Sequence, residues 1–224
     1  MTRMPIPRLQ VITDEVLQTR YTHLQLAQLA IAGGADAVQY REKRPLTTRE
    51  LMHTATDMLA SCRSASTCLI VDDRVDVARS AGAEAVHLGR HDLDAATARA
   101  ILGPDAIIGG TANSYNEARA VWASGVDYIG VGPIYGTQSK ANPAPVMGLD
   151  VLARICADSP LPVVAIGNVT AERIPEVIAA GAYGVAVLSA VLRADDPQAA
   201  TRRCRDALDS ALATTRTNTR AVQS

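Results

Sequence analysis

Residues 32–38, AGGADAV, decide the fold, because their pattern of a small helix end, a glycine and an apolar run is repeated along the chain. The pattern returns at residues 81–86 (AGAEAV), 124–129 (SGVDYI) and 180–185 (AGAYGV). A glycine in this place is typical of the residue that follows the last turn of a helix, and the run after it is typical of a buried strand. Each copy therefore predicts the end of a helix followed by the start of a strand.

The spacing of these copies predicts how many strands the chain holds. The glycines Gly34, Gly82, Gly125 and Gly181 are 48, 43 and 56 residues apart. One strand–helix unit takes roughly 25 to 30 residues, so each interval holds two units. Further apolar runs supply the intermediate strands at residues 9–13, 67–72, 106–109 and 162–166. Helical patterns fill the gaps, for example at residues 48–61, 94–102, 115–123, 148–157 and 171–179.

Eight alternating strands and helices with short connections predict an α/β fold, a single (β/α)8 TIM barrel. The alternative is an open doubly wound sheet that binds its ligand where the strand order reverses. No GxGxxG motif follows the first strand, which favours the barrel. We expect residues 1–213 to form this one domain and residues 214–224, which lack apolar periodicity, to be a disordered tail.

Composition narrows the class of function. The formal net charge of −1 gives no basic footprint, so we expect no nucleic-acid partner. The N-terminal residues lack the apolar stretch of a signal peptide, and no apolar run approaches the ~20 residues of a membrane span, so we expect a cytoplasmic protein without a membrane partner. The four cysteines are scattered and are expected to be buried, inert thiols: Cys62, Cys68, Cys156 and Cys204.

Candidate site residues follow the strands, because in this fold the chemistry lies at their C-terminal ends. After the second strand, Gln39, Arg41 and Lys43 alternate with other residues and so face one direction, towards the barrel mouth. Two cations and an amide at that place indicate a strongly anionic ligand, whereas elsewhere they would be ordinary surface residues. After the first strand come Thr13, Asp14 and Glu15, which we interpret as a helix N-cap and first-turn acids.

Two acids after neighbouring strands indicate a metal site. Asp73 follows the third strand and Asp92 follows the fourth. One or two carboxylates together with substrate phosphate oxygens are the usual ligands of Mg²⁺. The alternative is that both acids cap helices. His87, inside the fourth strand, is interpreted as a hydrogen-bonded core histidine rather than a catalytic base.

The loops after the last three strands predict phosphate binding. Residues 127–140, DYIGVGPIYGTQSK, run from a strand into a polar loop whose hydroxyls and lysine suit an anion, although an ordinary loop with a solvated lysine is the alternative. Residues 165–170, AIGNVT, and 186–190, AVLSA, each lead into a helix, and two helix N-termini can hold a phosphate with main-chain donors. Two anionic sites indicate two phosphorylated substrates, or one substrate with phosphates at both ends.

Taken together, these motifs resemble those of the thiamine phosphate synthase (thiamine-phosphate pyrophosphorylase) family. The resemblance covers residues 9–192 and rests on QYREK at 39–43, VDDRVD at 71–76, HLG at 87–89 with Asp92, GPIYGTQSK at 132–140, AIG at 165–167 and AVLS at 186–189. It implies a (β/α)8 transferase that condenses 4-amino-5-hydroxymethyl-2-methylpyrimidine diphosphate with thiazole phosphate or carboxythiazole phosphate. The products are thiamine phosphate and diphosphate, formed by a dissociative substitution that needs no protein nucleophile.

The resemblance also implies roles for single residues. The pyrimidine diphosphate would be bound by Gln39, Arg41, Lys43, Asp72, Thr111 and Lys140. Of these, the catalytic residues would be Arg41, Lys43, Lys140 and Thr111. The thiazole phosphate would be bound by Thr137, Ser139, Asn168, Leu188 and Ser189. The cofactor would be Mg²⁺ on Asp73 and Asp92, and the oligomeric state is open, a homo-oligomer included.

Four positions depart from the usual pattern of the family. Asp72 stands in place of an asparagine, Arg90 of a glutamine, Thr111 of a serine, and Asn168 of the second glycine of a pair. Asp72 matters most, because a further carboxylate repels a diphosphate unless Mg²⁺ or Arg90 offsets its charge. Asn168 adopts left-handed backbone angles more easily than most residues, so the phosphate turn is expected to survive.

These departures keep two alternatives open. One is a thiazole tautomerase of the same fold, which in its best-known form has a catalytic histidine where this chain has Pro133 and lacks the paired acids. The other is a non-catalytic barrel that binds thiamine precursors or a partner protein as a sensor. Pro133, Asp73 and Asp92 favour the synthase.

Overall fold

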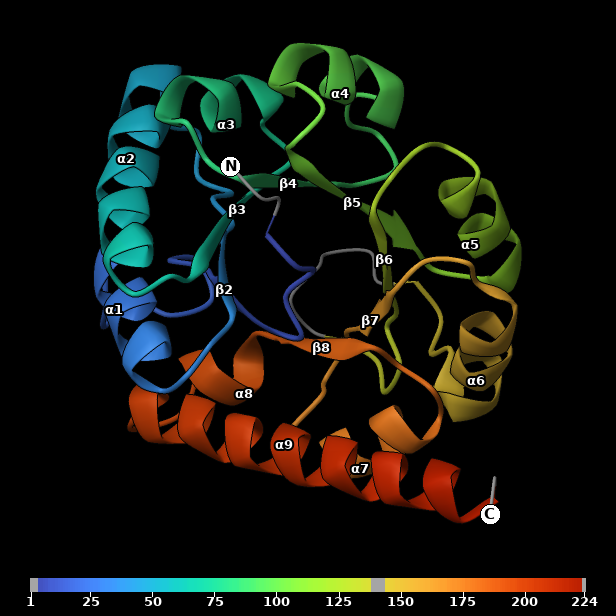
Figure 1. The fold of residues 1–224 in the computed structure, drawn as a ribbon. Coiled ribbons are helices and arrows are strands. Elements are labelled where there is room, and N and C mark those ends of the chain that lie inside the picture. The colour runs from blue at the N-terminus through green and yellow to red at the C-terminus, as the bar shows by residue number, and fades with distance from the viewer. Residues whose placement is uncertain (1–3, 138–143, 223–224) are drawn as a thin grey trace.

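Eight parallel strands pair in chain order and close into a barrel in the computed structural model, which describes residues 4–137 and 144–222 (Figure 1). Closure is made by β8 against β1, where Val185 lies opposite Leu9. This pairing confirms the predicted (β/α)8 barrel and excludes the open sheet. The strands are β1 Leu9–Thr13, β2 Ala37–Tyr40, β3 Cys68–Asp72, β4 Ala85–Leu88, β5 Ile107–Ala112, β6 Tyr128–Val131, β7 Val163–Ala165 and β8 Gly184–Val187.

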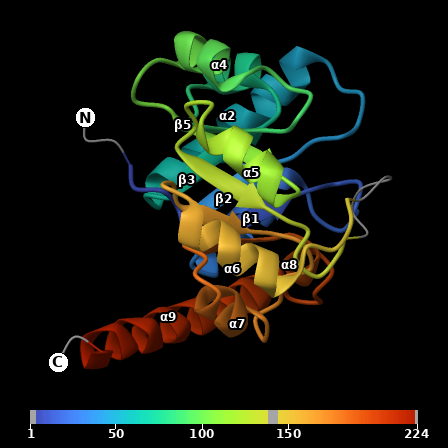
Figure 2. The same ribbon diagram turned by 90° about the vertical axis from the view of Figure 1, so that its right-hand side faces the viewer.

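Helices surround this barrel, and Figures 1 and 2 show them as an outer ring in which α5 and α6 lie side by side. Their bounds are α1 His23–Ala32, α2 Thr48–Ser64, α3 Val75–Ala81, α4 Ala95–Leu102, α5 Tyr115–Trp122, α6 Gly148–Asp158, α7 Ile174–Ala179, α8 Ser189–Leu192 and α9 Pro197–Val222. The repeated glycines end the helices as predicted, because all four have positive φ values, between 76° and 96°. Each precedes an even-numbered strand, so each interval between them holds two strand–helix units.

The last helix extends beyond the predicted domain boundary at residue 213. α9 continues to Val222, across most of the segment expected to be disordered. Ala211 is the last residue of α9 in the buried core. Beyond it, the hydroxyl groups of Thr214 and Thr217 donate to the carbonyl oxygens of Ser210 and Ala213, 3.0 and 3.1 Å away. These helical contacts are local and need no apolar stripe, which is why apolar periodicity gave no sign of them.

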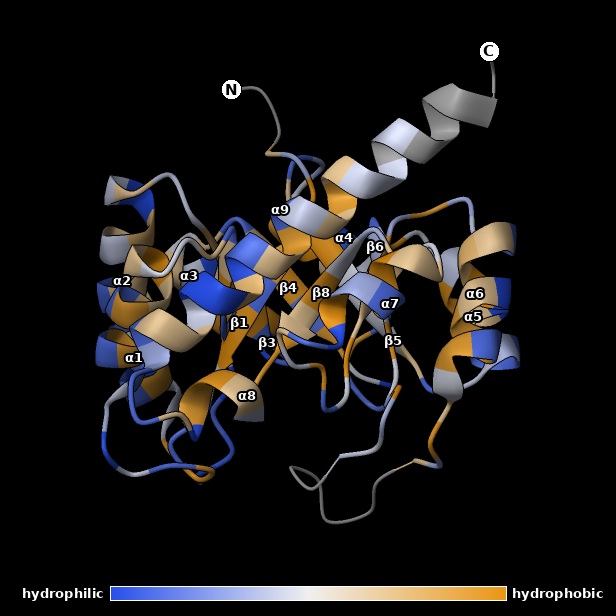
Figure 3. Ribbon diagram, turned by 90° about the horizontal axis from the view of Figure 1, so that it is seen from below, coloured by the Kyte–Doolittle hydropathy of each residue, from blue (hydrophilic) through white to orange (hydrophobic). Residues whose placement is uncertain are grey.

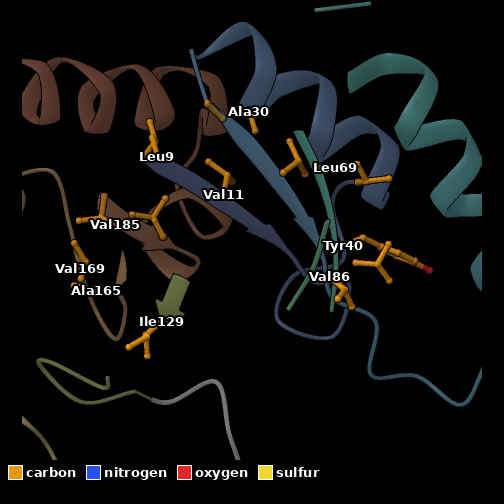
Figure 4. Packing of buried hydrophobic residues seen from close by; sticks show 14 of the residues in the cluster. Leu9, Val11, Ala30, Tyr40, Leu69, Val86, Ile129, Ala165, Val169 and Val185 are labelled. Atoms are coloured by element: carbon orange, nitrogen blue, oxygen red, sulfur yellow. The ribbon is translucent and has the colours of Figure 1, made fainter. Parts of the chain in front are cut away.

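Two apolar layers hold the fold together. The outer layer lies between strands and helices and includes Val11, Leu69 and Val185, which Figure 4 shows among their neighbours. The inner layer fills the barrel with side chains such as Ile70 and Ile107. Because successive strand residues point to opposite sides, every strand feeds both layers. The strands are accordingly hydrophobic almost throughout, whereas the helices carry one apolar face (Figure 3).

Ion pairs anchor the N-terminal end of the barrel. Asp36 precedes β2, accepts a hydrogen bond from the main-chain N–H of Leu9 at 2.8 Å and pairs with Arg205 at 3.1 Å. Glu84 precedes β4 and pairs with Arg63 at 2.9 Å. Both acids come two residues after a repeated glycine, so the sequence repeat also places an acid that pairs with an arginine at the start of the next strand.

The cysteines agree with the expectation of inert thiols, although Cys156 is only half-buried whereas the other three are buried. All four cysteines are free, and burial raises the pKa of Cys62 to about 12 and of Cys204 to about 11, which keeps them in the unreactive thiol form. Among the described residues, no helix is long and apolar enough to cross a membrane.

Candidate active site

A cavity opens at the C-terminal end of the barrel and gathers most of the predicted site. The predicted residues that line it are Gln39, Arg41, Lys43, Asp72, Asp73, Thr111, Thr137, Asn168, Leu188 and Ser189. They come from six strand ends that are far apart in the sequence, and parallel closure brings them together. Ser139 and Lys140 lie outside the described residues, so their predicted roles stay predictions.

The cationic side of the cavity is built by the segment after β2. Arg41 pairs with Asp14 and lies 3.8 Å from a carboxylate oxygen of Asp72. Lys43 lies 3.4 Å from Asp72 and pairs with Asp73. Burial lowers the pKa of Lys43, but the two acids outweigh it and raise the pKa overall, so the ammonium stays charged. Both cations thus pair with carboxylates of the protein, and a more highly charged anionic ligand could displace these carboxylates.

The alternate residues of this segment face the helices. The ring of Tyr40 packs edge-to-face against His23, with centroids 4.7 Å apart. Glu42 accepts a hydrogen bond from the main-chain N–H of Arg44 at 2.7 Å and lies 3.3 Å from Nε2 of His23. Strand-like alternation therefore continues past β2, and contacts behind the segment fix the direction of the cations in front of it.

Asp14 is placed differently from the prediction. The N-cap of α1 is Thr22, whereas Asp14 directly follows β1 with its side chain buried. Its Oδ1 accepts hydrogen bonds from the main-chain N–H groups of Val16 and Leu17 at 2.8 and 2.9 Å, and its Oδ2 accepts one from Arg41. Asp14 thus makes the hydrogen bonds of a cap, but residues 15–17 form a turn and not a helix, so the prediction of a helix there was wrong.

Asp73 and Asp92 stand together beside the cationic side. The N-cap of α3 is Arg74 and that of α4 is Asp94, so neither acid caps a helix. Asp73 has a positive φ of 62°, and Oδ2 of Asp92 accepts the main-chain N–H of Gly89 at 2.7 Å. Gly89 lines the cavity, and a Cβ there would lie 2.9 Å from Asp92 and 3.9 Å from Asp73. Both carboxylates therefore lie beside the same glycine.

The protonation of these acids reflects their crowding. Burial and the neighbouring charge of Asp73 raise the pKa of Asp72 to about 6, despite the cations beside it. Burial and Asp73 also raise the pKa of Asp92. Burial would raise the pKa of Asp73 as well, but its hydrogen bond from Lys43 lowers it overall. Arg90 pairs with Glu117 at 3.1 Å, so Lys43 and Arg41, rather than Arg90, offset Asp72.

The donor set beside Gly89 fits a hard divalent cation. Two carboxylates that disfavour each other's charge gain from a cation between them. The described residues hold no group of three or more His, Cys, Asp or Glu side chains that could bind a metal, and oxygen atoms of water and of a phosphate can supply the further ligands of such a cation. That is the pattern by which Mg²⁺ is bound next to phosphates.

Aromatic rings form the floor between the two sides of the cavity. His87 is joined to the hydroxyl groups of Tyr128 and Thr111 at 3.0 and 2.9 Å. Two glycines give these rings room, because a Cβ on Gly109 would lie 2.2 Å from the Tyr128 ring and one on Gly130 would lie 2.8 Å from His87. The prediction of a hydrogen-bonded histidine holds, but the same ring also lines the cavity.

The other side of the cavity presents backbone groups. The segment after β6 continues to pair beyond the strand, with Tyr135 N donating to the carbonyl of Gly167 at 3.1 Å. Gly167 has a φ of 104°, and a Cβ on it would meet Pro133 at 2.4 Å. Asn168 adopts the predicted left-handed conformation with a φ of 53°. Ser189 begins α8, so its N–H belongs to a helix N-terminus that reaches the cavity.

Several cavity residues escaped sequence reasoning. Gln10 and Tyr128 lie in strands that read as apolar runs, yet both line the cavity. Gln10 sits two residues before Ile12, which lines the cavity too, so strict alternation along β1 could have found it. For Asp14 no local signal exists, since its role depends on an arginine 27 residues away.

A closed (β/α)8 barrel whose mouth gathers cations, paired acids and a helix N-terminus defines an enzyme that acts on phosphorylated small molecules. A family model described as thiamine monophosphate synthase matches residues 9–191. The chain belongs to this family, and it is a transferase.

Named relatives agree with this assignment. A thiamine-phosphate synthase from Salinibacter ruber is 47% identical over 207 residues, covering 92% of this chain and 91% of that protein. One from Methanoculleus marisnigri is 45% identical, covering 92% of this chain and 97% of that protein. The solved structure of a thiamine phosphate pyrophosphorylase from Pyrococcus furiosus matches with a TM-score of 0.83 and 35% identity, covering 92% of this chain and 96% of that one.

Proposed function

We propose that this thiamine-phosphate synthase joins a pyrimidine diphosphate to a thiazole phosphate across the cavity at the barrel mouth. The observation that carries the proposal is that one cavity gathers Arg41 and Lys43, which follow β2, with Asn168 and Ser189, which follow β7 and β8. One side offers Arg41 and Lys43, and the other offers the turn at Asn168 and the start of α8 at Ser189. Family membership supports the same two substrates.

On the cationic side, Arg41 and Lys43 bind the diphosphate and take up the charge that develops as it leaves. Gln39 and Thr111 line the cavity next to them and orient the pyrimidine. Asp73 and Asp92 would hold Mg²⁺, which supplies further positive charge to the leaving diphosphate. The family resemblance assigns Lys140 to the binding of the same diphosphate.

On the opposite side, main-chain donors position the thiazole phosphate. Thr137 contributes a hydroxyl, and Asn168, Leu188 and Ser189 contribute backbone groups around the phosphate. The family resemblance adds Ser139. Anchoring the phosphate aims the thiazole nitrogen at the exocyclic carbon of the pyrimidine, which supplies much of the rate through orientation.

The substitution needs no protein nucleophile. An aminopyrimidine can stabilise positive charge on its exocyclic carbon, so the bond to diphosphate can break before the new bond forms. Both ring nitrogens of His87 are engaged with hydroxyl groups, and all four cysteines are kept as thiols. These features support a dissociative reaction driven by leaving-group stabilisation.

The cytoplasm is the proposed location of the protein. Free cysteines favour a reducing compartment such as the cytoplasm. The substrates named here are small molecules, and the homo-oligomer stays a prediction.

The deciding experiment incubates the protein with both precursors and Mg²⁺ and measures released diphosphate and thiamine phosphate. The synthase forms both products in equal amounts and only when both precursors are present. Isomerisation of carboxythiazole phosphate without a pyrimidine substrate would instead identify a tautomerase, a function that Pro133 in the cavity argues against. Binding of both precursors without any product would identify a sensor.

A further inference from the structure

Asp14 joins two main-chain groups and one arginine next to the cavity. Its side chain is 3% exposed. One carboxylate oxygen accepts two main-chain N–H groups, from Val16 and Leu17, and the other accepts the guanidinium of Arg41. The carboxylate therefore ties the turn after β1 rigidly to the end of β2.

The position of Asp14 relative to the cavity indicates its role. Arg41 and Asp72 line the cavity, whereas Asp14 is not among the lining residues. Asp14 thus holds the guanidinium from outside the cavity, and Asp72, 3.8 Å from Nε of Arg41, approaches it from the cavity side. Arg41 lies between two competing acids, and only one of them stands where the diphosphate must bind.

We propose that Asp14 is a positioning residue that keeps Arg41 oriented for the diphosphate and prevents it from pairing fully with the acids inside the cavity. This inference rests on the proposed function, since it assumes that the Arg41 side receives a diphosphate. Asp14 itself does not touch the substrate.

The physical reason is competition for one guanidinium. A buried arginine needs an acceptor for its donors, and a fixed carboxylate behind it supplies one without blocking its front. If Asp14 loses its charge, the nearest remaining carboxylate is that of Asp72. The guanidinium would then shift towards Asp72, and an incoming diphosphate would have to break that pair.

The test is Asp14→Asn, which keeps the size of the side chain and one oxygen for the turn but removes the charge. Calorimetry with inorganic diphosphate and Mg²⁺ should show roughly tenfold weaker binding, the expected loss for a charge-assisted hydrogen bond that is no longer well placed. Steady-state kinetics should show a raised KM for the pyrimidine diphosphate and a KM for thiazole phosphate within about twofold of the original.

A double-mutant cycle separates positioning from a structural role. In the Arg41→Ala background, Asp14→Asn should cause no further loss of diphosphate binding, because the residue it positions is gone. Equal losses in the two backgrounds would overturn the proposal. So would unchanged diphosphate binding in the single variant, or an equal rise in both KM values.

Asp127→Asn is the matched control. Asp127 also accepts a main-chain N–H, from Ile108 at 2.7 Å, and pairs with Arg99 at 2.7 Å, but it lies at the opposite end of the barrel, before β6. It should lower stability without changing diphosphate binding. If Asp14→Asn does not fold, Asp14→Glu enters the same cycle, and its displaced carboxylate should give a smaller loss that again vanishes without Arg41. The probe is inorganic diphosphate, so its binding can be measured even if the protein makes no thiamine phosphate. Absence of that product would refute the proposed function, and the binding measurement would still test the role of Asp14.

Discussion

The two ends of the barrel carry acids and arginines of the same kinds but use them for different purposes. At the N-terminal end, Asp36 binds the main-chain N–H of Leu9 and pairs with Arg205, so its charge joins elements of the chain to each other. At the C-terminal end, Arg41 and Lys43 face a cavity where Asp72 crowds them. The first arrangement joins parts of the protein to each other, whereas the cations of the second face a cavity that a ligand can enter.

This difference follows from the direction of the strands. All eight are parallel, so each end of the barrel gathers a different set of loops. Loops at the start of the strands are short and tied to helix ends, whereas loops at the C-terminal ends surround the cavity. Mutations at the two ends should therefore separate stability from activity.

The largest effect is expected for Asp73→Ala. Loss of one of the paired acids should lower turnover on the order of 10³-fold, because charge stabilisation by a bound metal contributes several kcal/mol to such a reaction. Stability should change little, since Asp73 and Asp92 crowd each other in the absence of a cation. Diphosphate release over a Mg²⁺ titration measures the first effect and urea unfolding the second. Full activity in the variant would remove the metal assignment.

Arg41→Ala tests whether the two substrates bind to different sides of the cavity. We expect about 10- to 100-fold weaker binding of the pyrimidine diphosphate, the usual range for hydrogen bonds to a charged group. Binding of thiazole phosphate should stay within about threefold, because that side relies on Asn168 and Ser189. Calorimetry with each substrate measures both. Equal losses would contradict the two-sided cavity.

Asp36→Ala tests the opposite end of the barrel. Loss of its carboxylate removes the acceptor of the Leu9 N–H and one of the two acids that pair with Arg205, which keeps Asp209. The free energy of unfolding should fall by about 1–3 kcal/mol, while kcat and both KM values stay unchanged. Urea unfolding and steady-state kinetics on the same preparation compare the two readouts. A lower kcat with unaltered stability would show that the ends are not independent.

Asp72→Asn should leave the fold intact and change stability in a way that depends on pH. The pKa of Asp72 is raised to about 6 in the folded chain, above about 3.9 when unfolded, so the folded state binds more protons between these values. This group therefore supports stability at low pH, and that contribution is lost as the pH rises through 6.

Asparagine has no such loss, so Asp72→Asn should gain on the order of 2 kcal/mol relative to the original chain between pH 4 and pH 7. Urea unfolding at both pH values measures the change. A difference between the two proteins that stays constant with pH would mean that burial and Asp73 do not raise this pKa.

Much of the barrel could be predicted because its signals are local. The repeated glycines end helices and the apolar runs after them form strands, and both depend on neighbours in the sequence. The alternation of Gln39, Arg41 and Lys43 was equally local, and all three line the cavity. Asn168 was expected to adopt left-handed angles from its residue type, and it does.

The parts that could not be predicted depend on distant partners. His87 reads as a buried strand residue, and only its contacts with Tyr128 and Thr111 place it at the cavity floor. The role of Asp14 likewise depends on a distant residue, Arg41. α9 extends beyond its expected end because the backbone hydrogen bonds of a helix join residues four apart and need no apolar pattern.

The sequence by itself determined the order of the elements, the parallel barrel and the residue types available at each strand end, because backbone geometry and apolar periodicity act over a few residues. Only the tertiary structure decided which charges meet. Arg41 has Asp14 on one side and Asp72 on the other, and that choice between anchoring and binding depends on distances across the closed barrel, which no local pattern encodes.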